Sequence, residues 1–183
     1  GPSPKAGFLH QLLEPNIIGL HHAFDAARHA GVRRIIFAST MQTLLGFEAL
    51  EHRPAHDPIT VAHGTRPINH YALSKLWGEQ YGEMISRLDR ITFFAVRIGW
   101  FPQNAASLAH MAKLHAQRWL LSHDDAKRFF IAAVQTPDPD PRFAILFATG
   151  PDGFVDVEPA RRLIGYNPQD RYPHGCSFGP ADA

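Results

Sequence analysis

The chain has 183 residues, of which 45% are hydrophobic and 19% charged, a balance that supports a folded core and argues against global disorder. Its formal charge of +1 gives no electrostatic reason to expect nucleic acid or an acidic membrane surface as a partner. Cys176 is the single cysteine, so no intrachain disulfide can form. Because no secretory signal or membrane-length apolar run is visible either, we expect a cytoplasmic protein.

The first half of the chain predicts two helices separated by a strand and a long loop. Apolar residues at three- and four-residue spacings indicate the first helix, which Pro15 kinks or restarts, and Asn69 is placed to cap the second. The expected elements are a helix over 8–30, a buried strand over 35–38, a loop rich in Pro and His over 46–68, and a helix over 69–88. The apolar side of the second helix is predicted to carry Leu73, Trp77, Tyr81 and Ile85.

The second half continues the alternation of strand and helix. The expected elements are a strand over 91–96, helices over 105–117 and 123–134, a linker over 137–141, a strand over 143–148 and a helix over 156–164. Ser122 is placed to cap the helix that starts at 123, with Asp124 and Asp125 in its first turn. The tail from Arg171 is polar and predicted to fray. This order of elements predicts an α/β fold with a parallel sheet.

Candidate chemistry lies at two points of this pattern. Ser39 and Thr40 end the first strand, where ligands bind in open α/β sheets, and Tyr71 and Lys75 lie one turn apart on the following helix. A phenol with an ordinary pKa of about 10 is a poor base at neutral pH. Since a nearby cation favours the phenolate, we expect Lys75 to lower the pKa of Tyr71. Such a set is typical of hydride transfer between an alcohol and a nicotinamide.

In this order, the residues resemble the extended short-chain dehydrogenases, the family of nucleotide-sugar epimerases, dehydratases and uronate dehydrogenases. The matching segments are 16–19, 35–40, 71–79, 97–99, 122–125 and 165–168. The resemblance covers about residues 7–170 and is closest to uronate dehydrogenases, through segments 37–39, 97–99 and 165–170. It implies a Rossmann-like, doubly wound parallel sheet, of which this chain holds the C-terminal portion. It also implies NAD as the cofactor, with NADP left open.

The resemblance also assigns roles to individual residues. Tyr71 would be the base and Lys75 would bind the ribose, while Thr40, rather than Ser39, aligns with the family's catalytic Ser or Thr. The residues expected to bind the cofactor are Tyr71, Lys75, Ala38, Ser39, Ile98 and Gly99. Those expected to bind the substrate are Ser39, Thr40, Met41, Gln42 and Trp100.

Two of the implied roles have simpler alternatives. Asn16 resembles a helix asparagine that supports the active-site architecture, but it could equally be a kink or cap residue beside Pro15. Gly99 could lie near the nicotinamide, or it could simply serve a turn at the end of a strand. The residues leave both choices open.

The substrate site departs from uronate dehydrogenases. Those enzymes have Ser-Ser-Asn-His where this chain has Ser39 followed by Thr40, Met41 and Gln42, and a small polar residue where it has Trp100. No arginine aligns with their carboxylate-binding arginine, for which Lys113 and Arg118 are candidates. Met41 and Trp100 either narrow the pocket or pack in the core, so a sugar acid is in doubt as the substrate.

The larger departure is the missing Gly-x-x-Gly-x-x-Gly loop, which would cradle the cofactor's pyrophosphate. We therefore expect a piece of a longer enzyme whose first βα units are absent and whose first remaining strand is an unpaired edge. Residues 1–170 would be the C-terminal part of the dehydrogenase domain, with a small substrate-binding region at about 98–170. Residues 171–183 would be a flexible tail.

Three functional readings follow. The first is an NAD-dependent oxidoreductase acting on a sugar or sugar-acid hydroxyl; the second is a non-catalytic dehydrogenase remnant that serves as a binding or scaffold module; the third is a nucleotide-sugar epimerase or dehydratase. A small sugar-like molecule is the expected partner, together with a second copy of the chain in a homodimer or larger homo-oligomer. No metal is expected, because Pro54 and Pro58 favour a solvated loop around His52, His56 and His63.

Overall fold

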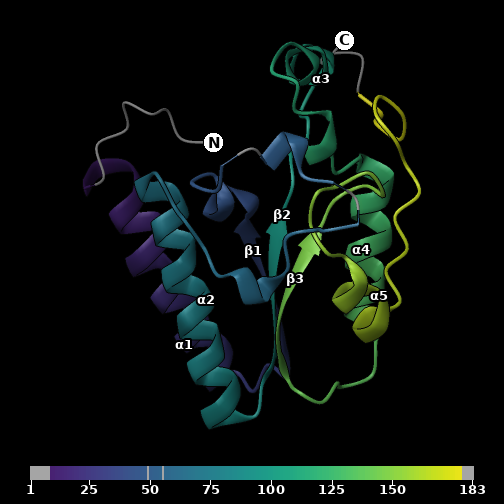
Figure 1. Ribbon diagram of the computed structural model, residues 1–183. Coiled ribbons are helices and arrows are strands. Elements are labelled where there is room, and N and C mark those ends of the chain that lie inside the picture. The colour runs from purple at the N-terminus through teal and green to yellow at the C-terminus, as the bar shows by residue number, and fades with distance from the viewer. Residues whose placement is uncertain (1–8, 49, 55, 179–183) are drawn as a thin grey trace. The chain divides into compact units, whose positions relative to one another are not determined.

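The computed structural model describes residues 9–48, 50–54 and 56–178 (Figure 1). Its α-helices are α1 (Gly19–His29), α2 (His70–Asp89), α3 (Ala105–Lys113), α4 (His123–Gln135) and α5 (Glu158–Ile164). The strands are β1 (Arg34–Thr40), β2 (Thr92–Ile98) and β3 (Phe143–Ala148). A π-helix, η1 (Leu9–Ile18), and short 3₁₀ turns, η2 (Met41–Leu44), η3 (Leu50–His52), η4 (Val61–His63) and η5 (Gln117–Trp119), complete the order. The predicted α/β class is confirmed.

One compact unit comprises residues 9–47, 65–97 and 138–145. Its parallel sheet has the strand order β1-β2-β3, so that β1 lies at an edge and β2 in the middle. Helices α1 and α2 run side by side, and α2 packs on β1 (Figure 1). This arrangement brings the carboxyl end of β1 next to the first turns of α2.

Aromatic rings from the strands fill the space under α2. The core combines Phe24 of α1, Phe37 of β1, Ile85 of α2, and Phe93 and Ala95 of β2. Two glycines of α2 let the helix rest directly on these rings. A Cβ at Gly78 would lie 2.5 Å from the Phe37 ring, and one at Gly82 would lie 2.2 Å from the Phe93 ring.

The predicted apolar side of the second helix was wrong for Leu73 and Trp77, whereas Ile85 is buried and Tyr81 packs against the core as predicted. Leu73 and Trp77 are 54% and 37% exposed. The buried face of α2 consists mostly of small and polar residues: Ala72, Ser74, Gly78, Glu79, Gly82, Ile85 and Ser86. The reason is physical, because the strands supply the large side chains at this contact and the helix has room only for small ones.

The first strand is longer and less buried than predicted. It runs from Arg34 to Thr40, and of the expected core run 35–38 only Phe37 is buried, while Ala38 is exposed. Its edge position explains the difference, since only one side of the strand is paired. Before it, Pro15 lies in π-helical η1, and regular α-helix starts at Gly19. Proline cannot donate the backbone hydrogen bond of a regular turn, so it fits the observed break.

The second compact unit comprises residues 48–64, 98–137 and 146–178, apart from 49 and 55. It holds α3, α4, α5 and the end of β3. The helix predicted over 105–117 ends at Lys113, because His115 adopts a left-handed φ of 52°. The predicted loop over 46–68 is not structureless, since Ile59 forms a parallel bridge with Val155.

A buried carboxylate ties the end of the chain to α4. Asp125 accepts the backbone N–H groups of Gln169 (2.9 Å) and Asp170 (2.9 Å) and the guanidinium of Arg128 (2.6 Å). Ser122 caps α4 as predicted, its hydroxyl oxygen accepting the Asp125 N–H at 2.9 Å. Further on, the Ser177 N–H donates to His123. The described part of the tail is therefore bound to the unit.

The described residues offer neither a membrane-spanning helix nor a metal-binding cluster. No helix there has the length and apolar character needed to cross a membrane. No group of three His, Cys, Asp or Glu residues there could hold a metal ion. In the loop expected to be solvated, the His63 ring accepts from the Thr60 N–H at 3.1 Å and contacts Arg53 at 3.2 Å.

Candidate active site

Thr40 is fixed at the point where β1 ends. Its backbone is extended, and its hydroxyl oxygen accepts the Gln42 N–H at 3.2 Å, which caps the following turn η2. The Thr40 carbonyl accepts the hydroxyl of Thr43 at 2.9 Å. Since the capping bond uses only a lone pair of the Thr40 hydroxyl, its hydrogen can still be donated elsewhere.

Tyr71 and Lys75 lie one turn apart at the start of α2, and both are partly buried. The Lys75 ammonium lies 5.1 Å from the centre of the Phe37 ring and 5.7 Å from that of the Tyr71 ring. These cation–π contacts hold the lysine against the tyrosine. Asn69 caps α2, as predicted, by accepting the Ala72 N–H at 2.8 Å.

The structure changes the expected electrostatics of Tyr71. Burial raises the pKa of Tyr71 above its ordinary value, and a hydrogen bond with the Thr40 side chain offsets only part of this. The sequence predicted the opposite direction, because it weighed the charge of Lys75 without the burial. Burial also lowers the pKa of Lys75. The structure thus brings Thr40, Tyr71 and Lys75 together, as the resemblance implied.

Asn16 connects the π-helix to the same turn of α2. Its side-chain amide donates to the Ser74 hydroxyl at 3.0 Å, and that hydroxyl donates to the Tyr71 carbonyl at 2.8 Å. Of the two alternatives left open for Asn16, this contact favours a supporting role. The wide π-turn beside Pro15 accounts for how Asn16 reaches α2.

Ser39 faces the interior rather than the sheet's open end. Its hydroxyl donates to a carboxylate oxygen of Glu79 at 2.5 Å, and Ser39 itself is buried. Glu79 in turn pairs with Arg97. Binding of cofactor or substrate by Ser39 stays a prediction, and it would have to compete with this internal bond.

The neighbouring predicted residues differ in exposure. Ala38 is exposed, Gln42 is partly exposed and Met41 is fully buried. The Gln42 side-chain carbonyl accepts from the Asn69 amide at 3.1 Å, which ties η2 to the cap of α2. The burial of Met41 favours core packing over contact with a substrate.

Ile98, Gly99 and Trp100 belong to the second unit. A Cβ at Gly99 would lie 2.3 Å from the Trp119 carbonyl oxygen, so close backbone packing accounts for this glycine. The indole N–H of Trp100 donates to the Ser107 hydroxyl at 3.3 Å. Contact of these three residues with cofactor or substrate stays a prediction.

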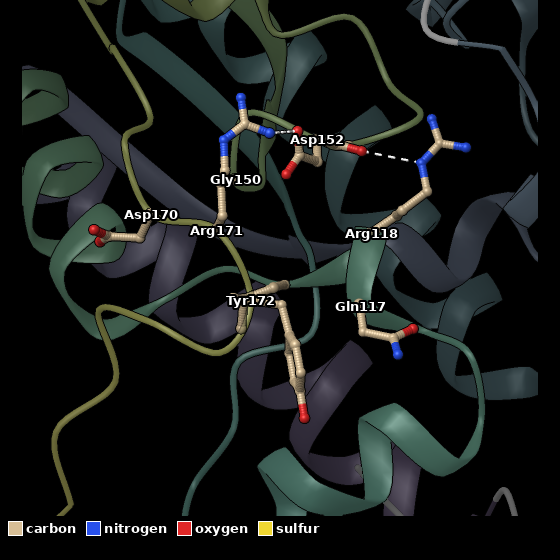
Figure 2. Close-up of a pocket in the computed structure, with 9 residues that line it drawn as sticks. Gln117, Arg118, Gly150, Asp152, Asp170, Arg171 and Tyr172 are labelled. Carbon is tan, nitrogen blue, oxygen red and sulfur yellow. Dashed lines mark hydrogen bonds and ion pairs between the residues drawn. The ribbon is translucent and has the colours of Figure 1, made fainter.

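The candidate carboxylate-binding residues also lie in the second unit. Lys113 is exposed at the end of α3. Arg118 lines a pocket of about 230 Å³ together with Asp152 and Arg171 (Figure 2). The Arg118 guanidinium donates to the carbonyls of Asp152 (3.0 Å) and Arg53 (2.7 Å), and Arg171 pairs with the Asp152 carboxylate. These internal contacts occupy groups that a sugar carboxylate would need.

The residues at the end of β1 fit the nicotinamide-ribose part of a dinucleotide. Within the described ranges no acidic side chain forms an ion pair with Lys75, and an ammonium has three donors suited to ribose hydroxyls. Ala38, which is exposed, lies near the carboxyl end of a parallel strand, where such ligands bind. The printed sequence contains no Gly-x-x-Gly-x-x-Gly segment for the pyrophosphate.

Sequence reasoning gave no role to Glu79 and Arg97, although both are buried at this site. A signal was present, because Glu79 follows Tyr71 and Lys75 at four-residue spacing and therefore shares their helix face. An ionisable residue on a buried helix face requires a partner. The partner itself, Arg97, could not be chosen from the sequence.

A parallel sheet with a hydroxyl at the end of its edge strand, and a tyrosine and a lysine on the helix packed against that strand, is typical of the short-chain-dehydrogenase class. The model of the NAD dependent epimerase/dehydratase family matches residues 8–100, and the chain belongs to this family. The family is NAD-dependent by its description, which agrees with the predicted cofactor.

Individual relatives are dehydrogenases of sugars and sugar acids. Uronate dehydrogenase of Pseudomonas putida is 35% identical over 130 residues, which make up 69% of this chain and 43% of that enzyme. L-arabinose 1-dehydrogenase (NAD(P)(+)) of Haloferax volcanii is 27% identical over 182 residues, covering 92% of this chain and 71% of that enzyme.

A solved structure shows the same fold. The crystal structure of uronate dehydrogenase from Agrobacterium tumefaciens superposes with a TM-score of 0.72 and 28% identity, over 93% of this chain and 59% of that one. This chain therefore spans only part of the enzymes it resembles. It shares their fold and family.

Proposed function

We propose that the protein is an NAD-dependent oxidoreductase that acts on a hydroxyl of a sugar or sugar acid. The observation that carries this proposal is the grouping of Thr40, Tyr71 and Lys75 where β1 meets α2. The relatives named for uronates and L-arabinose support the substrate class.

Each residue has a task in the proposed reaction. The Thr40 hydroxyl hydrogen-bonds the substrate oxygen, and Tyr71 removes the proton of the alcohol. Held there, NAD would supply the acceptor for the hydride of the carbinol carbon and a positive charge that favours the phenolate. Lys75 binds the ribose hydroxyls and adds a second cation beside Tyr71.

The substrate is better described as sugar-like than as a uronate. Arg118 donates to two backbone carbonyls, and Met41 and Gln42 replace polar residues that the resemblance associates with holding a sugar acid. A carboxylate without a bidentate arginine loses its strongest kind of partner. A panel of neutral aldoses and uronates, assayed with NAD, would decide between the two substrate types.

A non-catalytic binding module is the second candidate, because Ser39 and Arg118, two residues expected to hold a ligand, are engaged in internal hydrogen bonds. Titration of the chain with NADH, followed by tryptophan emission, separates the two. Saturable binding supports the oxidoreductase, whereas a folded sample that does not bind supports the non-catalytic module. An epimerase or dehydratase would differ again, by retaining NAD through the cycle rather than releasing NADH.

We further propose that the protein self-associates through α2. Four apolar side chains at helical spacing, Leu73, Trp77, Met84 and Leu88, are exposed along this helix. Trp77→Glu should shift a dimer to monomer in sedimentation, while Glu83→Ala, off this stripe, should not. A parent protein that sediments as a monomer would contradict the proposal.

A further inference from the structure

A buried three-membered network joins β1, α2 and β2. The two ends of the Arg97 guanidinium, Nε and an NH₂ group, donate to the two carboxylate oxygens of Glu79 at 2.9 and 2.7 Å. The Ser39 hydroxyl donates to the same carboxylate at 2.5 Å. The side chains of Arg97 and Glu79 are only 3% and 2% exposed.

This network touches the candidate site at two points. Ser39 directly precedes Thr40, so its hydrogen bond to Glu79 ties the end of β1 to α2. Glu79 lies two turns after Tyr71 and one after Lys75, on the same face of the helix. A single carboxylate thereby connects the strand that carries Thr40 to the helix that carries the other two residues.

Stability alone does not account for a buried ion pair at this place. Removing two charges from water is costly, and well-packed apolar residues often serve as well or better. A bidentate guanidinium–carboxylate pair offers instead a fixed geometry, because both groups are planar and held by two bonds. The same strands are also cross-linked at their other end, where Asp138 contacts Arg34 and Thr92 in a more exposed setting.

We propose that Glu79, held by Arg97 and bonded to Ser39, is a positioning residue that sets Thr40 relative to Tyr71 and Lys75. The effect of this positioning on turnover rests on the proposed function. The effect on the geometry of the site does not, because the contact of Thr40 with Tyr71 can be observed without a substrate.

The test uses the alkaline titration of Tyr71, followed by NMR with ¹³C-labelled tyrosine and assigned with Tyr71→Phe. The network is removed in the combined variant Ser39→Ala, Glu79→Leu and Arg97→Met, which leaves no unpaired buried charge. Ser39→Ala alone provides a milder variant that keeps the ion pair. Thr40→Val removes the hydroxyl through which the network is proposed to act, and Asp138→Asn is the matched control at the other end of the strands.

The proposal expects the network variants to shift the Tyr71 midpoint in the same direction as Thr40→Val. Adding Thr40→Val to the combined variant should then shift it little further, because both changes remove one contact. Asp138→Asn should leave the midpoint unchanged. The positioning role would be overturned if folded network variants had the same Tyr71 midpoint as the parent. It would also be overturned if the shift caused by the combined variant added in full to the shift caused by Thr40→Val.

Turnover distinguishes this proposal from the proposed function. In an active protein, kcat of the network variants should fall about tenfold or more, since small misplacements of reacting groups are costly, while KM for NAD changes little. A parent without NAD-linked turnover but with the expected titration pattern would refute the oxidoreductase and support the positioning role. Normal kcat in a folded network variant would overturn the positioning role and leave the oxidoreductase standing.

Discussion

Tyr71 is subject to opposing influences at the scale of a single residue. Burial raises the pKa of Tyr71, and the Thr40 hydrogen bond offsets part of this, yet a base must release its proton before it can accept another. A base role for Tyr71 therefore requires further positive charge near the phenol, which Lys75 and a bound cofactor would supply. In the proposed reaction, the single hydroxyl hydrogen of Thr40 would stabilise the Tyr71 phenolate before substrate binds and hydrogen-bond the substrate oxygen afterwards.

The first prediction concerns pH. Oxidation of the alcohol should speed up as pH rises, because the phenolate fraction of Tyr71 grows until the pH exceeds its pKa. Thr40→Val removes an interaction that lowers this pKa, so the midpoint of kcat/KM against pH should move upward. If the pH midpoint of kcat/KM stays in place or moves downward in this variant, Thr40 does not lower the pKa of Tyr71 through a hydrogen bond.

The second prediction concerns Lys75. Lys75→Ala should weaken NADH binding and lower kcat, because the ribose donors and the cation near Tyr71 are lost together. Fluorescence titration and initial rates measure the two effects. Lys127→Ala is a suitable control, since that lysine is exposed and pairs with Asp124 in its own helix. Unchanged affinity for NADH in Lys75→Ala would show that Lys75 does not bind the ribose.

At the scale of elements, the close contact between α2 and the sheet places the site. Gly78 and Gly82 have no side chain, so the helix approaches the rings of Phe37 and Phe93 directly. Any increase in that spacing would carry Tyr71 and Lys75 away from the end of β1. The two glycines therefore help to place Tyr71 and Lys75 at the end of β1.

The third prediction tests this contact. Gly78→Ala would gain about 1 kcal/mol from helix propensity at an open position, but here its Cβ would lie 2.5 Å from the Phe37 ring. Overpacking costs about 1–3 kcal/mol, so the free energy of unfolding in urea should fall. Glu83→Ala, on the exposed side of α2, should change it by about 0.5 kcal/mol or less. A stabilised Gly78→Ala variant would show that the contact is looser than described.

The sequence predicted the order of elements and the caps Asn69 and Ser122, because these depend on local patterns. It misplaced the buried face of α2, since the choice between Leu73 and Gly78 as the contact residue depends on rings supplied by strands distant in the chain. The pairing of Glu79 with Arg97 could not be predicted for the same reason, because the two residues lie on elements that only the fold brings together. Family motifs identified Tyr71 and Lys75, but only the folded structure shows that Ser39 faces inward while Thr40 contacts Tyr71.

At the scale of the whole molecule, the chain shares its fold with enzymes of which it spans only part. The aligned region covers 59% of the Agrobacterium tumefaciens structure and 43% of the Pseudomonas putida enzyme. The unit that contains β1 and α2 holds Thr40, Tyr71 and Lys75. The titration of Tyr71 and the binding of NADH can therefore be measured at these residues before a substrate is identified.

Tyr71 is the proposed base of an NAD-linked oxidation, and the whole proposed function depends on it. The most direct test measures NADH formation from a panel of sugars and sugar acids by the parent protein and by Tyr71→Phe, with NADH affinity determined for both. We expect turnover of at least one substrate by the parent, and in Tyr71→Phe a near-complete loss of turnover with cofactor binding retained. Near-normal turnover by Tyr71→Phe would contradict this base role.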